Sequence, residues 1–192
     1  MMAHRKLVRH VHEPGHLHEL TFSCYRRLPL LTNDAWRERL ARSLDEANRE
    51  ARVELVGFVF MPEHVHLLVH LADPSQALGR YLARIKQPFS AQIKEILVRN
   101  RSSLLRRLTV RERPGKTCFR FWQEGSGFDR NLFSPGAIEA SLAYIHQNPV
   151  TRGLCRDVTA WRWSSARFYL GQPPSRQQPG LPFVHGLPMH AL

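Results

Sequence analysis

Two apolar runs rich in branched residues, Leu55–Phe60 and Leu67–Leu71, flank residues 61–66, which read Met-Pro-Glu-His-Val-His. Runs of this length and composition are typical of β-strands, and the Pro-Glu break between them predicts a tight turn. On a strand, side chains two positions apart leave the same face, so the imidazoles of His64 and His66 project together. Such a pair can hold a divalent metal if a third group reaches it. The alternative is two half-buried strand residues with no ligand role.

The remaining hydrophobic pattern predicts an α+β sandwich, a ferredoxin/RRM-like antiparallel sheet with helices packed on one face. Asn148-Pro149 is expected to end a helix, because the residue before a proline disfavours helical backbone. The expected strands are Leu17–Tyr25, Val53–Met61, His64–Leu71, Phe119–Gln123 and Phe128–Phe133, and the expected helices are Ala35–Ala51, a stretch from Asp73 to about Val98 kinked or split at Pro88, Ala137–Gln147, and a short helix within Trp161–Leu170.

The length of 192 residues suits one domain with its own core. We expect a basic N-terminal extension at 1–16, a catalytic domain at 17–170 and a Pro-rich, irregular tail at 171–192. No apolar run approaches the ~18 residues of a membrane span, and the N-terminus lacks the apolar core of a signal peptide. Three scattered cysteines suit a reducing compartment, so we expect a cytoplasmic protein without a cysteine zinc site.

The chain is strongly basic, with 28 Lys and Arg against 16 Asp and Glu, a net charge of +12. This excess favours a polyanionic partner, and nucleic acid is a better candidate than a membrane because no basic amphipathic helix stands out. The densest stretch could be a solvated helix face, a mobile loop or a phosphate-binding arm, and we favour the arm because Glu112 is its only acidic residue. Trp122 could stack on unpaired bases, although core packing is an equal alternative. The arginines of the stretch are Arg99, Arg101, Arg106, Arg107, Arg111 and Arg113.

A second reactive segment lies at 143–150, Ala-Tyr-Ile-His-Gln-Asn-Pro-Val. Tyr144 and Asn148 are four residues apart, so on a helix they share one face. A phenol can attack a phosphodiester when a metal polarises the phosphate, and the amide oxygen of Asn148 could be the third ligand beside the two histidines. His146 and His70 are candidate proton shuttles. The alternative is a tyrosine packed on the core, with Asn148 as a helix cap.

Residues 61–68 resemble the His-hydrophobic-His signature of HUH-type single-tyrosine transposases. Residues 144–154 resemble the catalytic-tyrosine helix of the REP-associated branch of that family. Further blocks at 121–123 with 128–131, and at 161–166, match in the same order. The resemblance covers about residues 17–170. Two departures are Glu63, where Asn or Asp is commoner, and the order Thr151-Arg152.

The resemblance implies a metal-dependent tyrosine endonuclease and strand transferase that acts on hairpin-bearing single-stranded DNA. It makes His64, His66 and Asn148 ligands of Mg²⁺ or Mn²⁺, and it makes Tyr144 the nucleophile that forms a 5′-phosphotyrosine link. The covalent link conserves the phosphodiester energy, so no nucleotide cofactor is expected. Arg130, in one of the matching blocks, joins the arginine stretch and Trp122 as expected DNA contacts. The chain is expected to be a monomer or homodimer. The alternative is a domesticated, non-cleaving protein that binds nucleic-acid hairpins.

Overall fold

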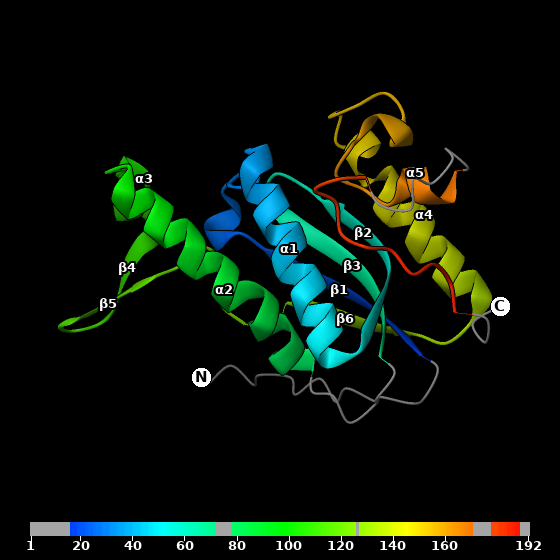
Figure 1. Cartoon of the computed structure of the whole chain (residues 1–192), viewed down its shortest axis with the longest axis horizontal. Coiled ribbons are helices and arrows are strands. Elements are labelled where there is room, and N and C mark those ends of the chain that lie inside the picture. The colour runs from blue at the N-terminus through cyan, green and yellow to red at the C-terminus, as the bar shows by residue number, and fades with distance from the viewer. Residues whose placement is uncertain (1–15, 72–77, 126, 171–177, 189–192) are drawn as a thin grey trace, which may run out of the picture.

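A four-stranded antiparallel sheet with strand order β2-β3-β1-β6 forms the centre of the molecule (Figure 1). The computed structural model describes residues 16–71, 78–125, 127–170 and 178–188. The sheet strands are β1 (Leu17–Ser23), β2 (Val53–Phe60), β3 (His64–Leu71) and β6 (Phe128–Leu132), and a separate hairpin pairs β4 (Thr109–Arg113) with β5 (Lys116–Phe119). The helices are α1 (Asp34–Ala51), α2 (Leu78–Arg99), α3 (Ser103–Leu108), α4 (Pro135–Thr151) and α5 (Ala166–Tyr169), with 3₁₀ turns η1 (Tyr25–Arg27) and η2 (Val158–Ala160).

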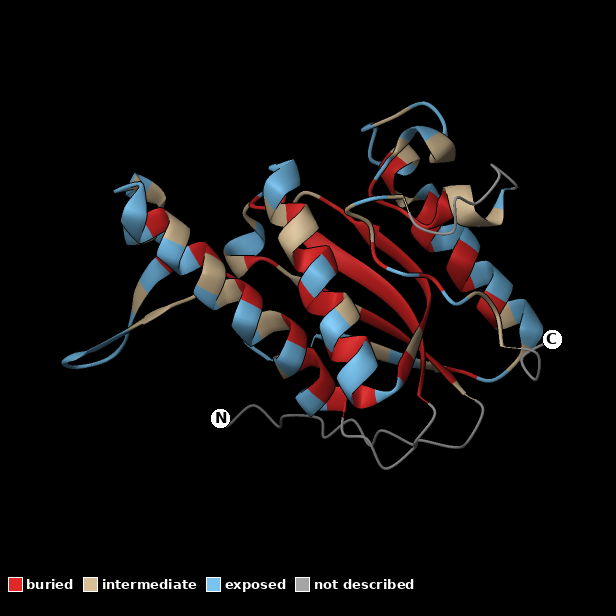
Figure 2. Ribbon diagram, viewed as in Figure 1, coloured by how far each residue is buried: buried red, intermediate tan, exposed pale blue. Residues whose placement is uncertain are grey.

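Helices cover both faces of the sheet. α1 and α2 lie side by side over one face, where the larger apolar cluster joins them to the strands. α4 packs on the other face through Ile138, Leu142 and Ile145. Strand β3 is buried along its whole length, as Figure 2 shows, because neither of its faces reaches solvent. The predicted α+β fold with an antiparallel sheet is confirmed, but the expectation that helices would cover a single face missed α4.

A bulge in β2 lets the strand serve both apolar clusters. The pairing of β2 with β3 shifts between Leu55 and Gly57. Because one extra residue inverts the in-out alternation, Leu55 and Phe58 both face α1 and α2 although their spacing is odd. A Cβ atom on Gly57 would lie 2.7 Å from Leu142 Cδ2. The missing side chain therefore allows α4 to approach the sheet closely.

Helix α4 begins where the sequence predicts and ends later. The side chain of Ser134 accepts a hydrogen bond from the backbone N–H of Ala137, and Pro135 occupies the first turn. The helix then continues through Pro149 to Thr151, so the prediction that it stops before Asn148-Pro149 was wrong. A proline near the end of a helix removes one backbone donor without ending the helix. Asn148 therefore lies inside the helix, one turn beyond Tyr144. Similarly, Pro88 lies within α2 and does not split it.

The arginine-dense stretch contains the end of α2, the short helix α3 and the strand β4. The β4–β5 hairpin extends away from the sheet, at the end of the molecule opposite α4 (Figure 1). The predicted strand Phe119–Gln123 was wrong, because β5 ends at Phe119 and the next two aromatic side chains turn into the core. The expected helix start at Asp73 and the extension at 1–15 lie outside the described residues. No helix in the described part of the chain has the length and apolar character needed to cross a membrane.

Candidate active site

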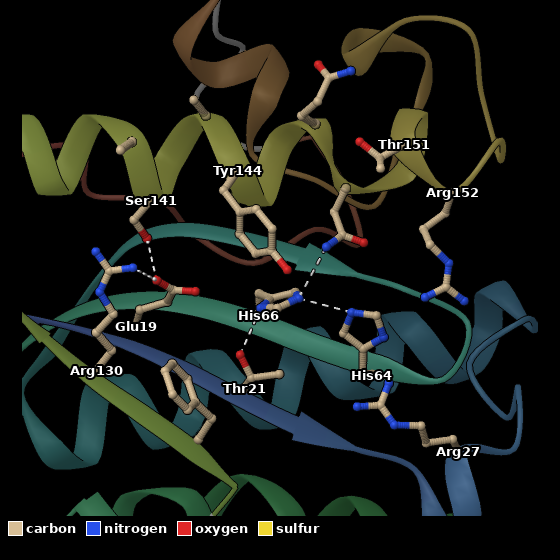
Figure 3. A pocket seen from close by; sticks show the side chains of 15 residues that line it. Glu19, Thr21, Arg27, His64, His66, Arg130, Ser141, Tyr144, Thr151 and Arg152 are labelled. Atoms are coloured by element: carbon tan, nitrogen blue, oxygen red, sulfur yellow. Dashed lines mark hydrogen bonds and ion pairs between the residues drawn. The ribbon is translucent and has the colours of Figure 1, made fainter.

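The two histidines of β3 point into one cavity on the α4 side of the sheet (Figure 3). Their Nε2 atoms lie 3.0 Å apart. Nδ1 of His64 donates a hydrogen bond to Glu63 Oε1 at 3.2 Å, and Nδ1 of His66 lies 2.8 Å from Thr21 Oγ1 on β1. A carboxylate only accepts hydrogen bonds, so Glu63 fixes the tautomer of His64 that leaves Nε2 with a free lone pair.

Tyr144 and Asn148 enter the same cavity from α4. The Tyr144 ring is 55% exposed, and its centroid lies 5.6 Å from that of His66. The amide nitrogen of Asn148 donates to Nε2 of His66 at 3.4 Å. Ser141, one turn before Tyr144, donates to the buried carboxylate of Glu19 at 3.1 Å. Helix α4 is therefore joined to the sheet by polar contacts on both sides of the tyrosine.

Burial keeps both imidazoles neutral. Desolvation lowers the pKa of His66 to about 3, and the positive charges of His64 and Arg27 lower it further. Desolvation also lowers the pKa of His64 below its ordinary value, against the opposing effect of the Glu63 carboxylate. Both rings consequently present lone pairs at neutral pH, which is the form that binds metal ions.

Two arginines flank His64 on opposite sides of the cavity (Figure 3). Arg27 ends η1, and Arg152 lies just after α4, where its Nη2 forms an ion pair of 2.8 Å with Glu63 Oε1. Arg130 of β6 lies further along the cavity, 3.9 Å from the Glu19 carboxylate. The cavity, with a volume of about 960 Å³, thus combines neutral imidazoles with guanidinium groups able to receive a phosphate.

The donor set fits a divalent cation. Two nitrogen ligands held ~2.1 Å from a metal ion at a right angle lie ~3.0 Å apart, which matches the Nε2 separation. Two lone pairs at that distance repel each other unless a cation or a proton lies between them. The buried oxygen Oδ1 of Asn148 has no hydrogen-bond partner among the described residues, and rotation of the amide would exchange it with the nitrogen that faces His66. No group of three His, Cys, Asp or Glu side chains in the described ranges forms an alternative metal site.

The other tyrosines are unsuited to attack a bound DNA strand. Tyr81 is fully buried and donates to Asn48 Oδ1 at 2.6 Å, while the hydroxyl of Tyr169 donates to the Val56 carbonyl at 2.7 Å. Burial raises the pKa of both hydroxyls above the ordinary value. Tyr25 lines a different cavity, so of the four tyrosines in the chain Tyr144 is the one that lines the cavity with the histidines.

Several predicted site residues lie elsewhere. Trp122 is 7% exposed and packs against Phe22 and Phe89, so it cannot stack on a base and that prediction is corrected. His146 is buried beneath α4, where its Nε2 lies 2.8 Å from Ser165 Oγ, and His70 pairs with Glu54, so neither lines the cavity as a proton shuttle would. Of the six stretch arginines, Arg107 and Arg111 line a second groove.

Sequence reasoning missed the residues that support the histidines. Thr21 and Glu19 come from β1, and Arg27 comes from a turn whose residues Arg26 and Arg27 both have left-handed backbone. The alternation of polar and apolar residues in β1 was a usable signal for Glu19 and Thr21, because both stand on the strand face opposite Leu20 and Phe22. Nothing in the local sequence indicates that Arg27 reaches the cavity.

Comparisons with known proteins find similar chains. The family model described as "Transposase IS200 like" matches residues 13–109, a span that includes both histidines and ends before α4. A Haemophilus influenzae protein that carries the name of a REP-associated tyrosine transposase is 31% identical over 113 residues, and the match spans 58% of this chain and 58% of that protein's length. A solved structure of a REP-associated tyrosine transposase bound to a REP hairpin has a TM-score of 0.66 and 19% identity, with coverage of 85% of this chain and 84% of that one. At that identity, the structural likeness concerns the fold alone.

Proposed function

The chain belongs to the family of IS200-like transposases, which confirms the resemblance seen in its sequence, and on that premise we propose that it cuts and rejoins single-stranded DNA beside hairpins. The observation that carries the proposal is the convergence of four side chains from two elements: His64 and His66 from β3, and Tyr144 and Asn148 from α4. The hairpin as substrate comes from the similar proteins that carry the REP-associated name.

His64, His66 and Asn148 would hold Mg²⁺ or Mn²⁺. When bound, the ion would polarise the scissile phosphate. Glu63 and Thr21 keep the imidazoles oriented through their Nδ1 atoms, a support that typically changes metal affinity ~10–100-fold when removed. Arg27 and Arg152 neutralise charge on the phosphate from either side of His64.

Tyr144 supplies the nucleophile. Its hydroxyl oxygen forms a bond to phosphorus while the bond from phosphorus to the 3′-oxygen breaks. The phenolic proton passes to water, and the departing oxygen takes up a proton to become a free 3′-hydroxyl. The 5′-phosphate is now esterified to the tyrosine. Attack by a 3′-hydroxyl reverses the exchange, so rejoining consumes no nucleotide.

The test is formation of a covalent adduct. Purified protein is incubated with hairpin-bearing single-stranded DNA and Mn²⁺, and the products are separated by denaturing electrophoresis. Wild type should give a band of protein joined to DNA, and Tyr144→Phe should give none while it binds DNA within about threefold of wild type. Tyr169→Phe, which removes a hydroxyl outside the cavity, is the matched control and should give the normal band. DNA binding without any adduct from wild type would instead favour the non-cleaving alternative.

A further inference from the structure

A second basic groove lies outside the cavity just described. It has a volume of about 460 Å³ and runs between η1 and the β4 strand. Its positive side chains come from three separate parts of the chain: Arg26 in η1, Arg107 and Arg111 around the start of β4, and Arg120 just after β5. Two of the four arginines thus lie outside the stretch that composition alone marks as basic.

Backbone contacts fix the two walls of the groove relative to each other. The N–H of Tyr25 donates to the Phe121 carbonyl at 2.7 Å, and the N–H of Arg26 donates to the Gln123 side chain at 3.1 Å. The N–H of Arg120 donates to the Leu108 carbonyl at 2.7 Å. The guanidinium groups are therefore mounted on a connected frame and not on a free loop.

The charges of the groove are only partly neutralised. Arg120 pairs with Glu124, and Glu112 on the groove wall pairs with Lys116 at 2.7 Å. Arg107 and Arg111 are exposed side chains, and Arg26 lies over the Tyr25 ring at 5.2 Å from its centroid. Because this guanidinium covers the groove's aromatic ring, the groove suits phosphate groups better than stacked bases.

η1 joins this groove to the catalytic cavity. Arg26 and Arg27 are consecutive residues with φ of 52°, and their side chains line different sites: Arg26 the groove, Arg27 the cavity beside His64. The turn follows β1 directly at the point where Ser23 pairs with His64. A chain of phosphates that leaves the cavity past Arg27 therefore meets Arg26 next.

We propose that this groove binds the phosphate backbone of the single-stranded DNA that flanks the cleavage site. The proposal rests on the proposed function, since it takes the cavity as the place where the strand is cut. It assigns the binding role to Arg26, Arg107 and Arg111, and it removes Arg99, Arg101, Arg106 and Arg113 from the role that their sequence density suggests.

Matched charge variants test the proposal. The groove variant carries Arg26→Gln, Arg107→Gln and Arg111→Gln, and the control variant carries Arg99→Gln, Arg106→Gln and Arg113→Gln. Both remove three exposed positive charges. All proteins also carry Tyr144→Phe, so that binding is measured without cutting and its outcome is independent of the adduct test. The DNA probes are one hairpin with its cleavage site, and the same hairpin extended by about ten dT residues on the 5′ or the 3′ side.

We expect the extension on one side to raise affinity for the unaltered and control proteins, and the groove variant to lose that gain. Each lost phosphate contact lowers the salt slope by about 0.7, so the groove variant should bind the extended DNA with a slope lower by about 2. Between about 50 and 200 mM salt, the unaltered protein should therefore lose about 20-fold more affinity than the groove variant.

Three results would overturn the proposal. Equal losses in the groove and control variants would mean that only net charge matters. An absence of gain from either extension would mean that no flanking strand is bound. Weaker binding of the unextended hairpin in the groove variant, with the gain from extension intact, would place the hairpin stem in the groove. Circular dichroism confirms folding, and Arg107→Gln with Arg111→Gln serves as a second variant that leaves η1 unaltered.

Discussion

At the scale of single residues, the site depends on two imidazoles that the fold keeps neutral and oriented. Glu63 and Thr21 hold the Nδ1 atoms of His64 and His66, which turns both Nε2 atoms toward each other. The sequence alone identifies the pair because the period of a strand is two. It does not identify the supporting residues, because their contacts form only when β1 pairs with β3.

Removing either histidine should abolish specific metal binding. For His64→Ala and for His66→Ala, isothermal calorimetry with Mn²⁺ should show at least about tenfold weaker binding, since two remaining ligands hold a hard cation poorly. Asn148→Ala should weaken binding less, and excess Mn²⁺ should partly restore its cleavage. His70→Gln, on the same strand but outside the cavity lining, is the control and should bind as wild type does. Unchanged affinity in both histidine variants would return the pair to a packing role.

His146 should make the fold sensitive to acid. Burial lowers the pKa of this residue to about 4, so the folded state favours the neutral ring while the unfolded chain takes up a proton near pH 6.5. The stability it contributes is present above pH 6.5 and is lost as the pH falls toward 4. His146 alone should cost about 2 kcal/mol between pH 7 and pH 5. Urea unfolding at the two pH values measures this loss. His146→Gln should show a loss smaller by about that amount, and an identical loss in both proteins would contradict the assignment.

At the scale of elements, the position of α4 decides whether the tyrosine and the histidines meet. The bulge in β2 and the bare Cα of Gly57 let Leu142 and Ile145 pack directly on the sheet. Polar contacts at Ser141 and at Arg152 then join the helix to β1 and to the β2–β3 turn. A shift of this one helix would separate the nucleophile from the metal ligands while leaving the sheet intact.

A side chain at Gly57 should impair cutting more than binding. Gly57→Val places atoms where Leu142 Cδ2 lies 2.7 Å and Ile145 Cδ1 lies 3.1 Å from the first added carbon. We expect a loss of about 1–3 kcal/mol in the free energy of unfolding and a larger fall in adduct yield than in DNA affinity. Gly136→Ala, in the first turn of α4 with nothing within 4 Å of the added carbon, is the control and should be neutral or slightly stabilising. Equal yields from the Gly57 variant and wild type would show that the helix position tolerates a shift.

The elements show where local sequence patterns lose their predictive value. Strand pairing at the two histidines and the helix that carries Tyr144 follow from periodicity. The helix end at Asn148-Pro149 does not, since Pro149 is buried and the helix continues around it. The strand expected at Phe119–Gln123 fails because Phe121 and Trp122 enter the same aromatic cluster instead of alternating. In both cases tertiary packing overrides a local preference.

At the scale of the whole molecule, the sheet separates two tasks. One face, covered by α1 and α2, holds the larger core, and the other presents the cavity beneath α4. The net charge of +12 suggests a polyanionic partner but does not say where it binds. The fold supplies that information, because arginines distant in sequence, such as Arg27 and Arg152, line one cavity only after β1 and α4 have packed.

The most direct test of the central claim is to identify the residue that carries the DNA. The covalent adduct is formed with Mn²⁺, digested with nuclease and then with protease, and analysed by mass spectrometry. We predict that a nucleotide 5′-phosphate will be found on the peptide that contains Tyr144, with fragment ions that place it on the phenolic oxygen. A nucleotide on Tyr25, Tyr81 or Tyr169, or on any residue outside the cavity beneath α4, would contradict the account.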